Sequence, residues 1–325
     1  MFSRISFVLT TRGRTAAASS LAAALLAALS PTGVRACACG CGIFEVGTSS
    51  MLPTTTGGML TVTDAYQNQS QDWSGSSRAP AGDNADRRIA TNFLTIGAQY
   101  LLNRSWGLEL SIPYVTRHFE TVGGASGNDL VNLHWSQLGD IRIQGVYTGF
   151  SPDLSTGLTF GLKLPNGSFT HNDAYDDVDR DTQIGTGSTD LLLGAFHRGN
   201  LGSAPLWQWF AQGEIDQPVL IRDGYRPGVE VDASLGVHYD GWRIHGVQVT
   251  PIAQVLGSAR ASDSGINAAV PVASGYQRVL LSPGIEVDLS SVRFYADVEL
   301  PVYQHVTGDQ LVAPVLWKFS ASYHF

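Results

Sequence analysis

Three cysteines, Cys37, Cys39 and Cys41, stand at alternate positions near the start of the chain and are its only cysteines. Thiolates are soft ligands that suit Cu(I) or Zn(II), and the small residues between them leave the peptide free to wrap around one ion. The spacing therefore predicts a soft-metal site. Copper or zinc at this tract is the only cofactor that the sequence suggests.

The same tract allows three other interpretations. In an oxidising compartment two of the thiols can form a disulfide, which leaves the third free or paired with a partner. Cys37 follows the small residue Ala36, as a lipidated cysteine does, although Arg35 stands where such a signal has a small residue. Signal cleavage after Ala38 instead of Ala36 would remove one cysteine. All four interpretations are consistent with the sequence.

A serine and a histidine, Ser136 and His134, have the His-x-Ser spacing found at the nucleophile of outer-membrane phospholipase. A serine nucleophile needs a base within hydrogen-bond reach and a third group that orients the base. The Asn and Gly pattern of that enzyme is missing around Ser136, and we expect the segment to lie in a loop. Lipid hydrolysis is thus the least favoured function, and we predict no enzyme activity and no catalytic residues.

The segment 172–181 contains five aspartates, enough oxygen ligands to bind a divalent cation. It lacks the glycine at the sixth place and the closing glutamate of a calcium-binding loop. We therefore expect a solvated loop, with adsorption of Ca²⁺ or Mg²⁺ beside lipopolysaccharide as the alternative.

The elements that must position these groups are strands, because polar and apolar residues alternate with a period of two. Residues 229–239 place Val, Ala, Leu and Tyr on one face and Glu230 and Asp232 on the other, and 292–303 and 315–325 alternate in the same way. The dry core of a β-sandwich cannot accept such charges unpaired, whereas a water-filled lumen can. Hydrophobic residues at 43% with only 15% charged residues also fit a sheet whose apolar face is turned outward.

The predicted fold is an all-β, transmembrane, antiparallel β-barrel of about twelve strands, because short and long connections alternate along the chain. We expect strands at 58–69, 88–101, 106–118, 139–149, 156–166, 187–198, 206–217, 229–239, 242–257, 276–288, 292–303 and 312–325. Long loops are expected at 70–87, 119–138, 167–186, 218–228, 258–275 and 304–311.

Upstream of the barrel, basic residues precede an apolar run at 16–29, which is shorter than the roughly 20 residues that a membrane-spanning helix needs. We predict a signal peptide at 1–36, a short periplasmic arm carrying the cysteines at 37–57 and the barrel at 58–325. The expected location is the bacterial outer membrane. Its lipid and lipopolysaccharide, the barrel-assembly machinery and a small-molecule permeant are the expected partners. The net charge of −8, with scattered Lys and Arg, argues against nucleic acid.

Charged residues on the predicted inner face form the candidate lumen lining. Acids outnumber bases there, so an open bore would favour cations, whereas pairing across the bore would make the charges a rigid filling; we favour pairing. The lining is predicted to include Arg142, Lys163, Asp190, Glu230, Asp232, Arg278, Arg293, Asp297, Glu299 and Lys318, and the same face carries Glu109, Glu214, Asp216, Glu286 and Asp288.

The sequence contains the short motifs Gly161-Leu162-Lys163-Leu164-Pro165-Asn166-Gly167, Gly185-Thr186-Gly187-Ser188-Thr189-Asp190, Leu138-Gly139-Asp140 and Glu299-Leu300-Pro301. These motifs resemble those of a barrel family named for the MetA pathway of phenol degradation. The resemblance implies an outer-membrane channel or transporter for small, often hydrophobic, molecules. The C-terminal Tyr323-His324-Phe325 looks like the signal by which assembly machinery recognises such barrels. The alternative function is a barrel-anchored module that uses the cysteine arm to bind a soft metal or dock a partner.

Overall fold

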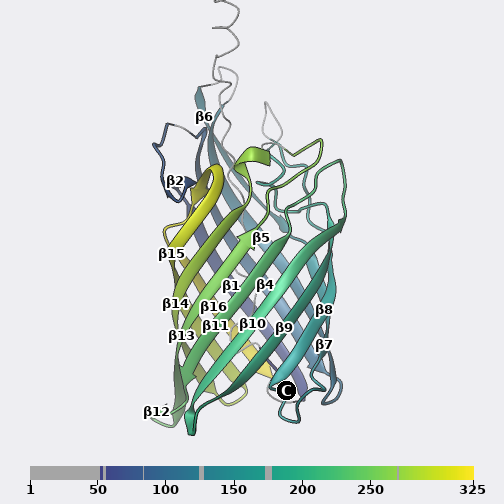
Figure 1. Ribbon diagram of the computed structural model, residues 1–325, viewed down its shortest axis with the longest axis vertical. Coiled ribbons are helices and arrows are strands. Elements are labelled where there is room, and N and C mark those ends of the chain that lie inside the picture. Colours follow the sequence, from purple (N-terminus) through teal and green to yellow (C-terminus); the bar gives the residue numbers. More distant parts are fainter. Residues whose placement is uncertain (1–51, 54–55, 83, 124–127, 173–177, 269–270) are drawn as a thin grey trace, which may run out of the picture. The chain divides into compact units, whose positions relative to one another are not determined.

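The computed structural model describes residues 52–53, 56–82, 84–123, 128–172, 178–268 and 271–325. In this part of the chain, twelve antiparallel strands form a closed barrel. Figure 1 shows the barrel from the side. The predicted all-β transmembrane barrel is confirmed. Its strands are β1 (Gly57–Gln69), β4 (Asp86–Leu101), β5 (Trp106–Gly123), β7 (Ile141–Tyr147), β8 (Thr156–Leu164), β9 (Thr189–Leu201), β10 (Ala204–Leu220), β11 (Glu230–Tyr239), β13 (Val247–Arg260), β14 (Tyr276–Leu289), β15 (Val292–Val312) and β16 (Leu316–His324).

The barrel closes where the last strand meets the first. In the antiparallel pairing of β1 with β16, Met59 lies opposite His324, and the Gly58 amide donates a hydrogen bond of 2.8 Å to the Phe325 carbonyl oxygen. The carboxyl end of the chain therefore lies at the end of the barrel with short turns, the lower end in Figure 1. In outer-membrane barrels this is the periplasmic end.

Three segments predicted to be loops, 70–87, 119–138 and 304–311, contain strands at the extracellular end. β5 continues to Gly123 and pairs with β6 (Asp129–Leu138), so the predicted loop at 119–138 is wrong. The predicted loop at 304–311 is also wrong, because β15 runs to Val312 and pairs with β2 (Gln71–Gly75), which in turn pairs with β3 (Ser77–Arg78). A short 3₁₀ helix (Pro271–Ala273) lies in the loop before β14.

The strand expected at 242–257 is interrupted by a turn. β12 (Trp242–Ile244) folds back on β13 through His245 and Gly246, whose φ angles are 51° and 86°. Positive φ at both central residues is the geometry of the tight hairpin turn that matches the twist of paired strands. The chain therefore adds a small periplasmic hairpin before β13 begins.

The outer face of the barrel changes character along β5. From Leu108 to Tyr114 the outward side chains are apolar, as lipid contact requires, whereas His118 and Glu120 point outward further along the strand. On the inner face of β5 the order is reversed: the polar Glu109 lies near the periplasmic end and the apolar Phe119 near the extracellular end. This reversal marks where β5 leaves the bilayer.

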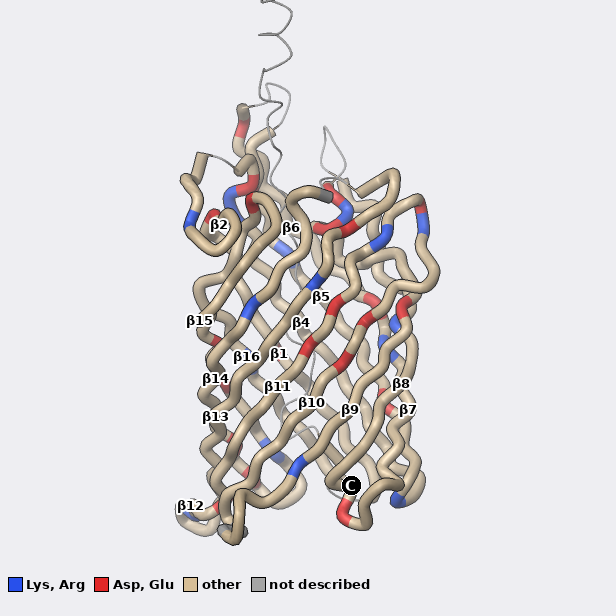
Figure 2. Tube along the Cα trace, in the orientation of Figure 1, with Lys and Arg blue, Asp and Glu red and all other residues tan. Residues whose placement is uncertain are grey.

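Aromatic rings form an outward girdle at the periplasmic end. The rings of Trp106 and Tyr147 lie 4.8 Å apart, and those of Trp207 and Tyr239 lie 4.9 Å apart. Such rings anchor a barrel at the lipid headgroups. Figure 2 shows charged positions at mid-height on the wall formed by β8 to β11 and in the loops at the upper end. No helix among the described residues has the length and apolar character needed to span a membrane.

Buried apolar side chains form separate clusters inside the barrel. Near the periplasmic end one cluster joins opposite walls, near mid-height a second lies beside Phe93, and a third fills the extracellular end. The periplasmic cluster consists of Leu52, Val146, Phe196, Phe210, Ile252 and Tyr295. The extracellular cluster consists of Ile89, Phe119, Trp135, Val178 and Leu311.

Candidate functional site

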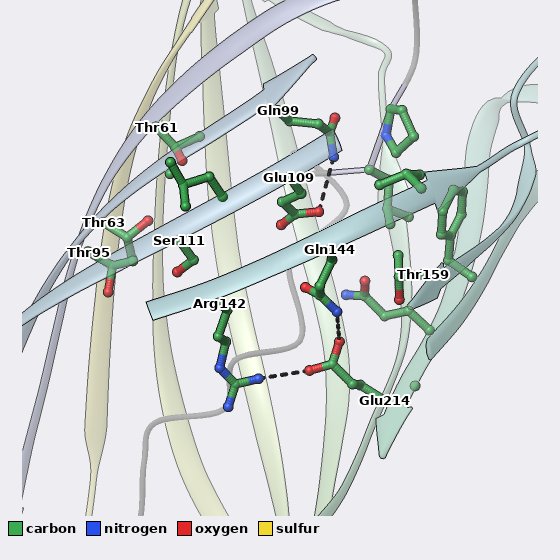
Figure 3. A pocket seen from close by; sticks show the side chains of 18 of the residues that line it. Thr61, Thr63, Thr95, Gln99, Glu109, Ser111, Arg142, Gln144, Thr159 and Glu214 are labelled. Carbon is green, nitrogen blue, oxygen red and sulfur yellow. Dashed lines mark hydrogen bonds and ion pairs between the residues drawn. The ribbon is translucent and has the colours of Figure 1, made fainter. Parts of the chain in front are cut away.

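A cavity of about 180 Å³ lies inside the bore beside the periplasmic cluster (Figure 3). Strands β1, β4 and β5 give it a mostly polar wall, and on the other side the apolar Leu52, Val146 and Phe196 lie among polar side chains of β7 to β10. The cavity therefore offers both polar and apolar contacts to a small molecule. The polar wall carries Thr61, Thr63, Thr95, Gln99, Glu109 and Ser111.

Two carboxylates of this cavity have different partners, as Figure 3 shows. Glu214 accepts hydrogen bonds from the Arg142 guanidinium at 2.8 Å and from the Gln144 amide at 2.6 Å. Glu109 accepts one hydrogen bond, from the Gln99 amide at 3.4 Å. The charge of Glu214 is thus matched by a cation, whereas that of Glu109 faces a neutral side chain.

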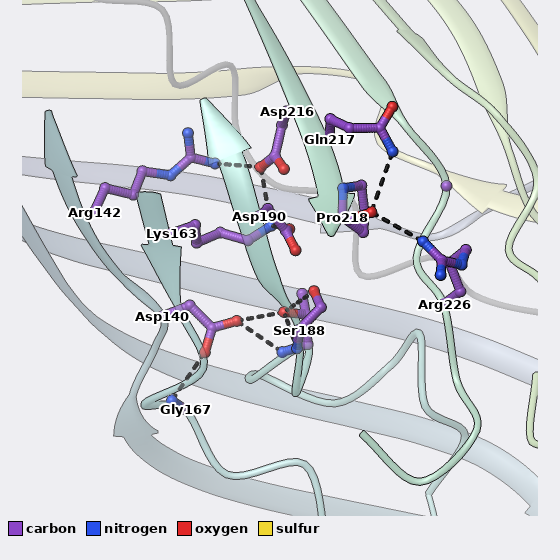
Figure 4. A network of polar contacts seen from close by, with 12 residues as sticks. Asp140, Arg142, Lys163, Gly167, Ser188, Asp190, Asp216, Gln217, Pro218 and Arg226 are labelled. Carbon is purple, nitrogen blue, oxygen red and sulfur yellow. Dashed lines mark hydrogen bonds and ion pairs between the residues drawn. The ribbon is translucent and has the colours of Figure 1, made fainter. Parts of the chain in front are cut away.

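Above this cavity, the inner wall of β7 to β10 carries a continuous charge network (Figure 4). Asp216 accepts hydrogen bonds from Arg142 at 3.2 Å and from the Lys163 ammonium at 2.9 Å, and Lys163 also forms an ion pair with the buried Asp190. These groups come from four consecutive strands, so the network ties that part of the wall together through its side chains.

A second cavity, of about 120 Å³, lies on the extracellular side of this network. Phe93 and Arg142 line both cavities. The bore between the two cavities is therefore bordered by an aromatic ring from β4 and a guanidinium from β7. Any molecule that passes between the cavities must pass these two side chains.

The ten residues predicted to line the lumen all lie on the inner face. Besides the network described above, Lys318 pairs with Glu299 at 3.1 Å, and Arg293 pairs with Glu286 and Asp288 at 3.2 and 3.0 Å. The remaining predicted residues contact side chains of their own or nearby strands. Asp297 accepts from Tyr295 and Ser282, Asp232 accepts from Ser258, Glu230 accepts from Tyr276, and Arg278 lies 5.0 Å from the Tyr276 ring.

Residues 165–172 and 178–188, the described parts of the loop 165–188, lie over the extracellular end of the bore. Arg117 projects inward from β5, is fully buried, and donates hydrogen bonds to the carbonyl oxygens of Thr182 and Gln183. Asp140 accepts hydrogen bonds from the amides of Gly167 at 2.9 Å and Thr186 at 2.8 Å (Figure 4). Polar side chains from the barrel wall thus hold both halves of the loop.

Phe93 and Arg117 were missed among the site residues predicted from the sequence. Both occupy inward positions of predicted strands, so the alternation itself was a signal that could have placed them in the bore. An isolated arginine or phenylalanine carries no motif, and the partners of Arg117 are backbone carbonyl groups, which leave no trace in the sequence.

The alternative catalytic and cation-binding segments have ordinary surroundings. Ser136 lies on β6, not in a loop, and its hydroxyl is 2.9 Å from that of Thr116 on the outer face. Within the predicted acidic loop, Val178 is buried in the extracellular cluster, and 173–177 lie outside the described residues. Cys37, Cys39 and Cys41 also lie outside them. In the described part of the chain no His, Cys, Asp and Glu side chains are grouped to hold a metal.

Comparison with known proteins identifies the fold. No profile of a known protein family matches the sequence, and neither does any curated protein. Among solved structures, an outer membrane channel from Pseudomonas putida F1 is 13% identical, with a TM-score of 0.60 over 86% of this chain and 100% of that one. The β domain of the Bordetella autotransporter BrkA is 14% identical (TM-score 0.48, 83% and 100% coverage), and the CymD monoaromatic hydrocarbon channel is 12% identical (0.42, 90% and 98%). The chain thus has the fold of an outer-membrane β-barrel.

Proposed function

We propose that this barrel is an outer-membrane channel through which small molecules pass by way of the two cavities of the bore. The observation that carries the proposal is the cavity between β1, β4 and β5 on one side and Leu52, Val146 and Phe196 on the other. If the bore were simply a packed core, side chains would fill the volume of this cavity, because protein interiors are close-packed. The similar fold of a protein described as an outer membrane channel supports the same conclusion.

The apolar side chains that line the cavity favour permeants with an apolar part. Phe196 and Leu52 are buried but border the open space, so a molecule in the cavity can bury carbon atoms against them. Hydroxyl groups of Thr61, Thr63 and Ser111 provide hydrogen bonds on the other side. A small molecule with an apolar body and one polar group fits this arrangement.

The direct test is to refold the mature chain in detergent, verify folding by heat-dependent gel mobility, and measure conductance in planar bilayers and swelling of liposomes in small solutes. The Ser111→Trp variant fills the cavity and should reduce both signals. Ile112→Trp is the matched control, because its neighbouring side chain points outward to lipid and should leave both signals unchanged. A correctly folded barrel without conductance or swelling would refute the channel.

A further inference from the structure

We propose that the cavity recognises small organic cations, namely amines with an apolar body, through the carboxylate of Glu109. The inference rests on the proposed channel function and specifies the class of molecule that the channel accepts. Three observations carry it: the partners of Glu109, the partners of the neighbouring charges, and the walls of the cavity.

The described part of the chain donates only one hydrogen bond to the carboxylate of Glu109. Its carboxylate projects into the cavity from β5, and its one hydrogen bond there comes from the Gln99 amide at 3.4 Å (Figure 3). An ionised carboxylate can accept about four hydrogen bonds, and 3.4 Å is beyond the usual range of about 2.7–3.2 Å. The described residues place no basic side chain within ion-pair distance of it.

The cations that border the same cavity already have carboxylate partners. Arg142 pairs with Glu214 at 2.8 Å and with Asp216 at 3.2 Å, and Lys318 pairs with Glu299 at 3.1 Å. Turning either of them toward Glu109 would leave another acid in the bore without its partner, which is costly in a low-dielectric interior. A cation that neutralises Glu109 must therefore come from outside the wall.

The remaining walls suit an ammonium group on an apolar body. An ammonium has three donors and no acceptor, and the hydroxyl oxygen of Ser111, two residues from Glu109 on the same face of β5, is an acceptor in the same cavity. The carbon skeleton can then lie against Phe196 and Val146 on the opposite side. An anion of the same size would be repelled by Glu109, whereas the charge of Glu214 is already matched by Arg142.

The test compares benzylamine with benzyl alcohol, its neutral analogue of equal heavy-atom count, by isothermal titration calorimetry on the refolded barrel in detergent. Benzylamine should bind the native chain about tenfold more tightly, as a charge-assisted hydrogen bond permits. Glu109→Gln keeps the shape of the side chain, removes its charge and should abolish this preference. Asp64→Asn is the matched control: it removes an acidic charge from the outer face, where Asn92 bonds to it, and should preserve the preference.

Equal binding of the two compounds by the native chain, or an unchanged preference in Glu109→Gln, would overturn the inference. Calorimetry requires no transport, so this result is independent of the swelling assay. If neutral solutes cause swelling but the barrel binds benzylamine no more tightly than benzyl alcohol, the channel stands and the amine site fails. If benzylamine binds with the expected pattern but nothing permeates, the site stands and the channel fails.

Discussion

The guanidinium of Arg117 on β5 donates a hydrogen bond of 3.2 Å to the carbonyl oxygen of Gln183, and so connects the barrel wall to the loop that covers the extracellular end of the bore. The same side chain bonds to the Thr91 hydroxyl at 3.1 Å and is buried. The buried guanidinium of Arg117 therefore fixes the loop 165–188 to the barrel wall at Gln183.

Removing this contact should release the loop. Arg117→Ala leaves buried carbonyl oxygens without their donor, at a cost of about 1–3 kcal/mol. Hydrogen exchange of amides in 178–188 should therefore become about tenfold faster or more, and conductance should rise. Arg78→Ala is the control, because this exposed arginine on β3 bonds to the Gln71 side chain and should leave exchange in 178–188 unchanged. Equal exchange in the two variants would show that Arg117 does not hold the loop.

The passage between the two cavities should widen when its aromatic border is removed. Phe93→Ala is expected to raise single-channel conductance, because Phe93 lines both cavities from β4. Phe319→Ala removes a ring of the same size from the lipid-facing side of β16 and should leave conductance unaltered. The measurement is the current of single channels in a planar bilayer at fixed voltage. The same current in both variants would place the narrowest point elsewhere.

The ion pair of Lys318 with Glu299 should affect stability strongly. Both side chains are almost completely buried, so Lys318→Met leaves an acid in the wall without its counter-charge. We expect a loss of about 3–5 kcal/mol in the free energy of unfolding, measured by urea titration in detergent. The double variant Lys318→Met with Glu299→Gln should recover a substantial part of this loss, because both charges are then absent. Additive losses would contradict the pairing.

Tyr225 should make the extracellular loop sensitive to alkaline pH. Burial raises the pKa of its hydroxyl well above the ordinary value, and Asp263, which accepts its hydrogen bond at 2.6 Å, adds to the rise. A raised pKa in the folded state means that the stabilisation is complete below the ordinary tyrosine pKa of about 10 and is lost as pH increases toward the folded pKa. Hydrogen exchange in 221–229 should thus accelerate above about pH 10. Tyr225→Phe, which cannot ionise, should show a flatter pH profile, and an equally steep profile would exclude Tyr225 as the cause.

The sequence predicted the membrane-spanning part of the fold better than the part outside it. Strands such as β11 alternate because lipid lies on one side and a polar bore on the other, and their bounds were found within a few residues. β6 was missed because it projects beyond the bilayer. Its outward residues include His134 and Ser136, whereas Trp135 points inward, so its pattern is the reverse of that in the spanning strands.

The candidate site could be predicted only in part. Alternation placed acids such as Glu109 on the inner face, but it carries no information on which opposite charges meet across neighbouring strands. That Glu214 pairs with Arg142 while Glu109 does not depends on strand register and side-chain rotamers. The position of Leu52 in the periplasmic cluster likewise could not be predicted, because the sequence around it has no periodic pattern.

The extracellular apolar cluster constrains the order in which the protein can assemble. Ile89 on β4 and Leu311 on β15 belong to the same cluster, although β1 and β16 lie between their strands in the sheet. The two side chains can meet only after the first and last strands have joined and their upper ends have reached the outside of the cell. The extracellular cluster is therefore complete only in a closed barrel, and a protease added from the extracellular side would distinguish finished barrels from those still open at the seam.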